Sequence, residues 1–418
     1  MPIEDRTTGD DPQDDAPGRD DPQIVRSGGR VFTLEALRER IEEQFNDEFA
    51  GRDDLLREAD TQAKRRALLL DSANYVLAIE SIFLSRADKE RLLDQAYANL
   101  FGFGPLEPYL GDETLTEITI DGPDKVHARR GSGRLERLPV AFDDTAHLRR
   151  TIDRILAAQG ATLVEGNYFL EIGVEVHTRP ARLSLIAPPI SPHLQVELRL
   201  HPRTPPTLDD LVGGGMLIEA AARAITGHIA AGRGLLVIGD VGSGKTTLLG
   251  ALGPAFTGRA IAVQRAAELR LPESVQARAA VPPTHDDPGV DFGAQIEAAL
   301  AESPDWLILD EVRDDAARAA WNALNAAEGD RAPRCAWAFR GEPAPDRVRN
   351  ALSMLLRRAH PAADQRALNR LAAARLPLVV GLAVVDAAPR VVSMGEFALD
   401  ESGELALRPR PDLTAGGA

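Results

Sequence analysis

The segment that most constrains this chain of 418 residues is the octapeptide GDVGSGKT, at residues 239–246. An apolar run at 235–238 precedes it, and a run with the composition of a helix begins at Thr247. A glycine-rich turn of this pattern, between a buried strand and a helix, is typical of α/β sheets whose loops bind phosphate groups. We therefore expect such a sheet, with this turn at the carboxyl end of one strand.

Each residue type in the octapeptide has a chemical reason. Gly242 and Gly244 let the backbone curl so that its N–H groups point at phosphate oxygens. Lys245 is expected to reach the β- and γ-phosphates, and the Thr246 hydroxyl to ligate Mg²⁺. The predicted ligand is a nucleoside triphosphate with its metal, which we expect to be ATP and Mg²⁺. The predicted binding residues are Gly239, Asp240, Val241, Gly242, Ser243, Gly244, Lys245, Thr246 and Thr247.

A second apolar strand, at 306–309, ends in the carboxylates Asp310 and Glu311. Beside a phosphate-binding loop, Asp310 is predicted to hold the Mg²⁺ shell through water, and Glu311 to polarise the attacking water. Glu268 follows the strand at 261–263 and is a further candidate catalytic residue. The alternative for each carboxylate is a solvated position at the end of a strand.

Arginines can stabilise the charge of a transferred phosphoryl group, from within the chain or across a subunit boundary. The candidates for γ-phosphate contacts are Arg182, Arg199 and Arg313. Many arginines only solvate a surface, and this reading stays open for each of the three.

Composition and hydrophobic periodicity along the sequence predict five regions. Residues 1–30 are rich in Asp, Pro and Gly and are expected to be a disordered acidic arm. Helical periodicity over 31–100 predicts a small helical region, and short alternating segments over 101–203 predict an α+β N-terminal domain. Strands and helices alternate over 204–408, which predicts a RecA-like P-loop NTPase domain of the α/β class. Residues 409–418 are expected to be frayed.

Composition narrows the possible partners. Acidic residues outnumber basic ones by 64 to 48, which argues against a nucleic-acid partner. The single cysteine, Cys335, fits a reducing compartment. The longest apolar run, at 376–385, contains a proline and is too short to span a bilayer. We therefore expect a cytoplasmic protein that does not itself cross the membrane.

Several short blocks follow one another in a recognisable order: FGFGPLEP at 101–108, TEITIDGP at 116–123, TLDDL at 207–211, AAEL at 266–269, PD at 304–305 and EVR at 311–313. On these blocks, the region from 33 to 408 resembles the type II/type IV secretion ATPases. Within them it resembles the CpaF-like motors of Flp/Tad pilus assembly. Several blocks in the right order are more specific than the octapeptide alone.

This resemblance implies a cytoplasmic homo-oligomer, a hexamer, peripheral at the inner membrane. Its N-terminal and RecA-like domains would clamp ATP at their interface, and hydrolysis would move one domain against the other. That motion would drive pilin assembly or secretion through an inner-membrane platform protein, the implied partner.

The chain also departs from the family. Gln264 and Arg265 stand where the acidic box has Glu-Asp, and glutamine cannot act as a base. The histidine box should fall within 329–341, where this chain has no histidine, and the family's GRRIDE becomes GATLVE at 160–165. Conversely, Asp310 stands where many members have glycine, which gives a fuller carboxylate pair.

The departures leave two interpretations open. The chain is a working motor, because phosphoryl transfer depends mainly on positioning and charge stabilisation and auxiliary residues can be replaced. Alternatively, it is a relative that binds ATP but hydrolyses it slowly or not at all, as a structural or regulatory subunit. We expect an ATPase of reduced or altered activity. A third class, an unrelated P-loop kinase or GTPase, fits the N-terminal blocks poorly, and no N-K-x-D motif occurs.

Overall fold

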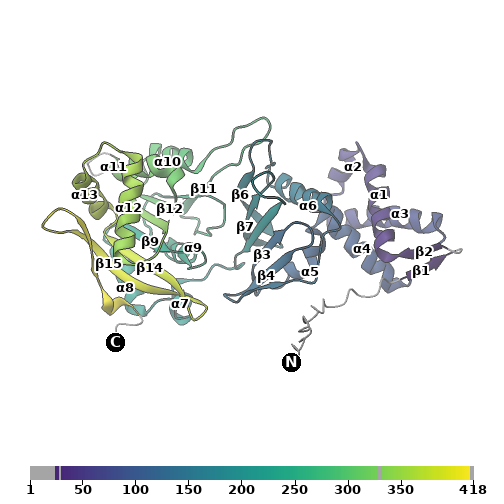
Figure 1. Ribbon diagram of the computed structural model, residues 1–418, viewed down its shortest axis with the longest axis horizontal. Coiled ribbons are helices and arrows are strands. Elements are labelled where there is room, and N and C mark those ends of the chain that lie inside the picture. Colours follow the sequence, from purple (N-terminus) through teal and green to yellow (C-terminus); the bar gives the residue numbers. More distant parts are fainter. Residues whose placement is uncertain (1–23, 28–29, 327–331, 415–418) are drawn as a thin grey trace, which may run out of the picture. The chain divides into compact units, whose positions relative to one another are not determined.

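A computed structural model describes residues 24–27, 30–326 and 332–414 (Figure 1). They form two compact units, one from the described residues up to 108 together with 139–142, and the other from the described residues of 109–138 and 143–414. Most of the expected disordered arm, residues 1–23 and 28–29, lies outside the described residues. The domain boundaries expected near 101 and 204 stay predictions.

The first unit is a helical bundle with a small hairpin. Its helices begin at capping side chains, because Thr33, Thr61 and Ser85 each accept a backbone N–H of the first turn. The predicted apolar positions of the first helix are buried, from Leu37 to Phe49. The elements are β1 (Ile24–Ser27), β2 (Arg30–Thr33), α1 (Leu34–Phe49), α2 (Asp53–Glu58), α3 (Gln62–Ile79), α4 (Arg86–Phe101) and η1 (Gly104–Leu106).

The hairpin corrects one prediction. Disorder is expected through residue 30, yet Ile24–Ser27 pairs with Arg30–Thr33 as an antiparallel hairpin. The apolar pair Ile24 and Val25 gives this short segment strand character, which the Asp- and Pro-rich composition of the rest of the arm hides.

The second unit contains a six-stranded antiparallel sheet in the order β5-β4-β3-β8-β7-β6. Buried and half-buried side chains alternate along β8 and most of β7. One face of the sheet is therefore buried in the core, and the other is partly exposed. Helix α6 (Thr145–Ala157) begins at Asp144, whose side chain caps it. The strands are β3 (Leu115–Asp121), β4 (Val126–Arg130), β5 (Leu135–Arg137), β6 (Phe169–Val176), β7 (Arg179–Ile186) and β8 (Gln195–Leu200), and the four-residue helix α5 (Glu107–Leu110) precedes them.

The same unit contains an eight-stranded sheet in the order β11-β10-β12-β13-β9-β14-β15-β16. The pairs from β11 to β14 are parallel, and β15 and β16 add antiparallel strands at one edge. The strands are β9 (Leu235–Gly239), β10 (Ala260–Gln264), β11 (Val275–Ala279), β12 (Trp306–Val312), β13 (Arg334–Arg340), β14 (Leu378–Val385), β15 (Ala388–Leu399) and β16 (Leu405–Pro409).

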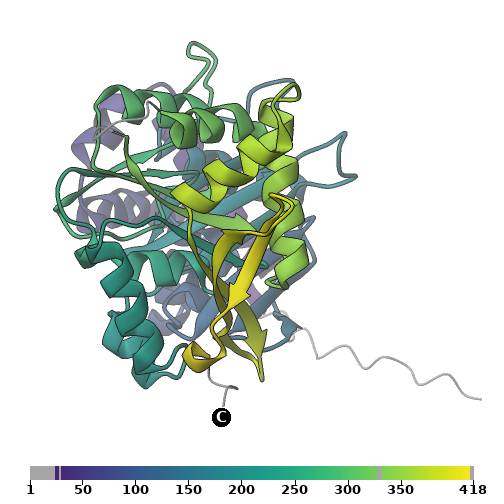
Figure 2. The same ribbon diagram turned by 90° about the vertical axis from the view of Figure 1, so that its left-hand side faces the viewer.

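Helices cover both faces of this sheet, as a doubly wound α/β fold requires (Figures 1 and 2). One face packs against α7 (Leu208–Gly213), α8 (Glu219–Ala230) and α9 (Lys245–Ala251), which is followed by η2 (Gly253–Ala255). The other packs against α10 (Phe292–Ala301), η3 (Asp314–Ala316), α11 (Ala317–Asn325), α12 (Pro345–Ala359) and α13 (Gln365–Arg375). The predicted α/β fold, with a P-loop sheet after an α+β domain and a helical region, is confirmed.

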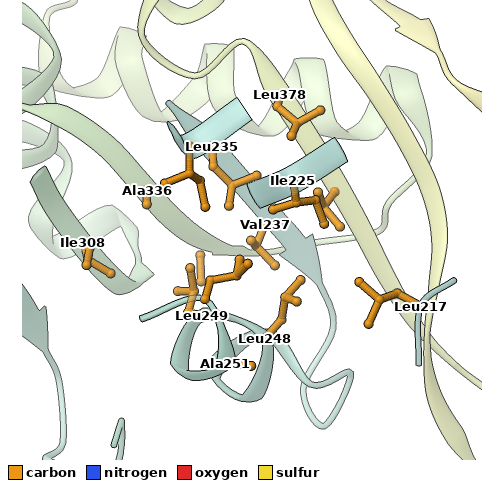
Figure 3. Close-up of a cluster of buried hydrophobic side chains, with 14 of the residues drawn as sticks. Leu217, Ile225, Leu235, Val237, Leu248, Leu249, Ala251, Ile308, Ala336 and Leu378 are labelled. Atoms are coloured by element: carbon orange, nitrogen blue, oxygen red, sulfur yellow. The ribbon is translucent and has the colours of Figure 1, made fainter. Parts of the chain in front are cut away.

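Alternate residues of β9 belong to opposite cores, so this strand is buried on both faces. Leu235 and Val237 pack with Leu248 and Leu249 of α9 (Figure 3), whereas Leu236 and Ile238 face the other core. Continuous burial is why the strand reads as an unbroken apolar run. The packing fixes α9 against the strand and therefore fixes the loop between them.

The carboxyl-terminal segment is more ordered than expected. Pro409 ends β16, and η4 (Pro411–Leu413) places the buried Leu413 in the core beside α8. A frayed tail from 409 is therefore wrong for residues 409–413, because one apolar side chain anchors them. Residues 415–418 lie outside the described residues. No helix in the described part of the chain is long and apolar enough to cross a bilayer.

Candidate functional site

The octapeptide forms the turn from β9 into α9. Gly242 and Gly244 have φ angles of 76° and 90°, in a left-handed region of the backbone that residues with a Cβ atom rarely adopt. The Ser243 N–H donates to the Asp240 carbonyl over 3.2 Å, and the Val241 N–H to Asp240 Oδ1 over 2.8 Å. Helix α9 begins at Lys245, two residues before the run expected at Thr247.

Lys245 is folded onto its own loop. Its Nζ donates to the carbonyl oxygen of Asp240 over 2.8 Å, and its side chain is buried. Burial lowers the pKa of Lys245, and the nearby negative charge of Glu311 opposes part of that shift. The ammonium group of Lys245 is therefore hydrogen-bonded to a neutral acceptor within the loop.

A cavity of about 470 Å³ opens beside this loop, a volume in the usual range for small-molecule sites. Ten of the predicted site residues line it, from both sheets: Val241, Gly242, Gly244, Lys245, Thr246, Thr247, Arg182, Arg199, Glu268 and Glu311. Five others do not appear on its wall: Gly239, Asp240, Ser243, Asp310 and Arg313. The structure therefore brings together most of the predicted residues, including pairs far apart in the sequence.

Asp310 and Glu311 occupy different environments, as successive residues of a strand do. Asp310 is buried, its Oδ2 accepts the Arg265 N–H over 2.9 Å, and its Oδ1 finds no partner among the described residues. Burial, with a contribution from the negative charge of Glu268, raises the pKa of Asp310 to about 8. Glu311, in contrast, reaches the cavity wall.

Glu311 is held by an arginine on its own strand end. Arg313 Nε lies 2.6 Å from Glu311 Oε1, and its terminal nitrogens contact Glu171 of β6 over 2.8 and 3.3 Å. Burial alone would raise the pKa of Glu311, but the charge and hydrogen bond of Arg313 outweigh it and keep the pKa below its usual value. Arg313 therefore keeps this carboxylate ionised, and it also ties β12 to the six-stranded sheet.

A second set of ion pairs connects the two sheets through Arg182 of β7. Its Nη1 lies 3.2 Å from Glu171 and 3.3 Å from Glu268. The other oxygen of Glu268 is 2.8 Å from Nε2 of His201. Burial would raise the pKa of Glu268, yet the His201 hydrogen bond and the Arg182 charge lower it. Arg199, the third predicted arginine, pairs with Glu197 at the edge of the cavity.

Gln264 and Arg265, which replace the acidic box, form hydrogen bonds at the site. The buried Gln264 accepts the Leu269 N–H over 2.7 Å. Arg265 donates to the Glu311 carbonyl over 2.9 Å and to both carboxyl oxygens of Asp315. Its guanidinium also lies 4.5 Å from the ring centre of Phe292. Sequence reasoning missed this role because the contacts depend on β10 lying beside β12.

Two further residues at the site lack any local sequence signal. His201, in the Pro-rich segment after β8, is a partner of Glu268 and lines the cavity. Arg340 ends β13 and lies 3.3 Å from Asp240 of the loop. Arg340 ends a largely buried strand, and only the position of that strand end at the carboxyl edge of the sheet singles it out.

The side chains present fit a metal-bound triphosphate. The Thr246 hydroxyl belongs to a residue of the cavity wall. Asp310 does not line the wall, so its buried Oδ1, which has no partner among the described residues, would serve a metal only through water, and a bound cation would favour its ionised form. Hydroxyl and carboxylate oxygens are the ligands that Mg²⁺ prefers. Lys245 and the positive end of the loop supply the charge that phosphate oxygens need.

Sequence relatives share about half of the chain. It is 31% identical over 222 residues to two proteins from strains of Mycobacterium tuberculosis, each described as "Putative conjugal transfer protein". The match covers 51% of this chain and 63% of each relative, so the chain spans less than two thirds of the length of these proteins.

Solved structures also show similarity. The VirB11 ATPase from the Brucella suis type IV secretion system, in complex with sulphate, is 19% identical, with a TM-score of 0.34 over 72% of this chain and 96% of that one. The Legionella pneumophila ATPase DotB is 17% identical, with a TM-score of 0.43 over 72% and 77%. The pilus retraction motor PilT with bound ADP is 15% identical, with a TM-score of 0.46 over 72% and 79%.

A family model described as "Type II/IV secretion system protein" matches residues 99–328. The matched region contains the antiparallel sheet, the P-loop and strand β12 with its two carboxylates. This match is consistent with the enzyme class that the sequence predicts, a P-loop ATPase. The chain therefore belongs to the type II/IV secretion system protein family.

Proposed function

We propose that this protein binds Mg-ATP in the cavity beside the β9–α9 loop and hydrolyses it. The observation that carries the proposal is that Lys245, Thr246 and Glu311 line one cavity, although Glu311 comes from a different strand. A triphosphate on the loop would meet an ammonium, a hydroxyl and an ionised carboxylate at one end.

Each side chain then has a role. Lys245 exchanges the Asp240 carbonyl for phosphate oxygens, and Thr246, with Asp310 through water, holds the Mg²⁺ that neutralises phosphate charge. Glu311 orients and polarises the attacking water as its general base. Glu268 has both oxygens occupied by Arg182 and His201, so its contribution is to fix Arg182 at the cavity wall.

A specific observation favours reduced activity as the alternative. Arg182 and Arg313 each engage two carboxylates inside the chain. Freeing either arginine for a phosphate would break a largely buried ion pair, which is costly. A protein that binds ATP but turns it over slowly, as a structural or regulatory subunit of the same machinery, is consistent with these contacts.

We further propose a cellular role that rests on the family and on the resemblance to CpaF-like proteins. The chain would be a homohexameric motor of pilus assembly or of type II/IV secretion. It would act in the cytoplasm, peripheral to the inner membrane and coupled to a platform protein there, with no nucleic-acid partner. The names of its relatives, a conjugal transfer protein and a pilus retraction motor, support a transport or pilus machine without choosing between them.

The test compares the wild type with Lys245→Ala in calorimetry with Mg-ATP and in steady-state turnover. The substitution should abolish binding and lower kcat by at least about a hundredfold, since it removes a charged donor from the transition state. Lys125→Ala, at an exposed lysine of β3–β4, is the matched control and should behave as wild type.

The outcomes separate the candidate functions. If the wild type binds Mg-ATP but is as inert as Lys245→Ala, the hydrolysing motor is excluded and the binding subunit stands. If the wild type takes up no Mg-ATP at all, both candidate functions fail.

A further inference from the structure

Arg340 occupies a position that the topology fixes closely. It ends β13, which lies between β12 and β9 in the sheet, and its Cα partner across β9 is Gly239, the first residue of the octapeptide. The next residue continues the pairing, because the Gly341 N–H donates to the Gly239 carbonyl over 3.2 Å. The backbone of Arg340 is therefore anchored at the edge of the sheet where the P-loop begins and where Glu311 lies near the end of β12.

Its side chain points along the loop. Arg340 Nε lies 3.3 Å from Oδ1 of Asp240, and Arg340 lines a cavity of about 550 Å³ together with Val241, Glu311 and Arg313. This cavity shares Val241 and Glu311 with the one beside Lys245. Arg340 thus lies next to the position that the third phosphate of a bound triphosphate would occupy if Glu311 is to orient water onto it.

Arg340 is also the most available of the arginines at the site. Its side chain is 60% exposed, whereas those of Arg182, Arg199 and Arg313 are 11%, 24% and 34% exposed. Its partner Asp240 is 79% exposed, and exposed ion pairs contribute little. A triphosphate could therefore replace Asp240 as the partner of Arg340 at small cost.

We propose that Arg340 binds the terminal phosphate of the nucleotide, and that Asp240 is the partner that both cations exchange for phosphate oxygens. The carbonyl of Asp240 holds Lys245 and its carboxylate holds Arg340. On binding, both cations turn to the phosphates. The planar guanidinium can donate two parallel hydrogen bonds to phosphate oxygens, a geometry that a surface ammonium does not offer. This inference rests on the proposed function, because it names one more residue of the same site.

The competing explanation is a surface ion pair that only shields the charge of Asp240. In that case Arg340→Ala would expose a carboxylate beside the phosphates and weaken all nucleotides alike. The effect would then disappear once Asp240 has been neutralised. A contact with the terminal phosphate predicts the opposite on both points, which makes the two explanations separable.

The experiment measures Kd for Mg-ATP and Mg-ADP by calorimetry in Arg340→Ala, Arg340→Lys, Asp240→Asn and the double variant Asp240→Asn/Arg340→Ala. Loss of Arg340 should weaken ATP by roughly 10- to 100-fold, as for a hydrogen bond to a charged group. ADP should change by less than about threefold, because it lacks the phosphate in question. The same ATP-selective loss should appear in the Asp240→Asn background, and Arg340→Lys should recover part of it. Arg410→Ala, which removes another exposed arginine–aspartate pair, is the control and should change neither affinity.

Two results would overturn the assignment of Arg340. One is an equal loss for ATP and ADP, and the other is no further loss when Arg340 is removed from Asp240→Asn. Either result, with Mg-ATP binding intact in the wild type and lost in Lys245→Ala, leaves the proposed function standing. Absence of Mg-ATP binding by the wild type would instead refute the proposed function itself.

Discussion

The side chain of Glu311 is placed where an ionised carboxylate is useful. It is largely buried, lies 2.6 Å from Arg313 and faces the cavity of Lys245. A carboxylate that stays ionised in a largely buried site can accept a hydrogen bond from a water molecule. That hydrogen bond orients the oxygen of the water for attack, which is the task of a general base.

Glu311→Gln tests that task. The amide keeps the shape of the side chain but cannot take a proton, so we expect Mg-ATP binding to persist while kcat falls by about 10²- to 10⁴-fold. Calorimetry and single-turnover hydrolysis measure the two effects, with the exposed Glu273→Gln as the control. Wild-type turnover in Glu311→Gln would remove this residue from the chemistry.

Glu268 predicts a pH dependence of stability. Its pKa lies below the ordinary 4.5, since His201 and Arg182 outweigh the opposing effect of burial. A lowered pKa means that the ionised form stabilises the fold above about pH 4.5, and that this stabilisation is lost as the pH falls through the folded pKa.

Glu268→Gln should therefore lower the unfolding temperature at pH 7, by the equivalent of about 1–3 kcal/mol for a hydrogen bond to a charged group. The difference from the wild type should narrow as the pH falls below 4.5, because the wild type then protonates the same carboxyl group. Thermal melts between pH 7 and pH 3 measure it. A difference that stays constant over this range would show that Glu268 is not an ion-pair partner of Arg182.

At the scale of elements, β12 is held in register by β10 through Arg265. The backbone N–H of Arg265 binds Asp310, its Nε binds the Glu311 carbonyl, and its terminal nitrogens bind Asp315. These contacts surround the irregularity in the pairing of β12 with β13 between Leu309 and Val312, the segment from which Glu311 reaches the cavity wall.

We expect Arg265→Ala to lower kcat by about tenfold or more with a small change in ATP affinity, because a misplaced base costs rate rather than binding. Circular dichroism should show a folded protein, and Arg259→Ala, at a half-exposed arginine directly before β10, is the control. Loss of Mg-ATP binding in Arg265→Ala at unchanged kcat would contradict this positioning role.

The elements that sequence predicts well are those whose signal is local. The strands at 235–238 and 306–309 are continuous apolar runs because both of their faces are buried, and the octapeptide fixes the turn after the first. The hairpin at Ile24–Ser27 escaped prediction because its pairing is short and its neighbours are polar. The contacts of Gln264, Arg265 and Arg340 escaped it for another reason. They depend on which strand lies beside which, and periodicity along one chain carries no information on strand order.

At the scale of the whole molecule, the hexamer proposed above has a measurable consequence for the mass of the protein. The described residues already supply the P-loop, the carboxylates and five arginines from one chain, so the proposed assembly would serve motion and regulation more than completion of the site. Binding that favours the assembled state shifts its population by mass action.

We therefore expect the protein at micromolar concentration to gain mass toward six chains when Mg-ATP is added, and Lys245→Ala to show no such gain. Mass photometry or light scattering with size exclusion measures it, with Lys125→Ala as the control. A wild type that stays monomeric with saturating Mg-ATP would contradict a nucleotide-dependent hexamer.

The contact between Lys245 and the Asp240 carbonyl has a consequence for how the site recycles. The ammonium group is hydrogen-bonded to an uncharged oxygen of its own turn. It is therefore neither fully hydrated nor paired with an anion. Arrival and departure of the ligand then swap one short-range partner for another, with little rearrangement of the turn. The backbone of the turn would then stay in place while Lys245 changes its hydrogen-bond partner.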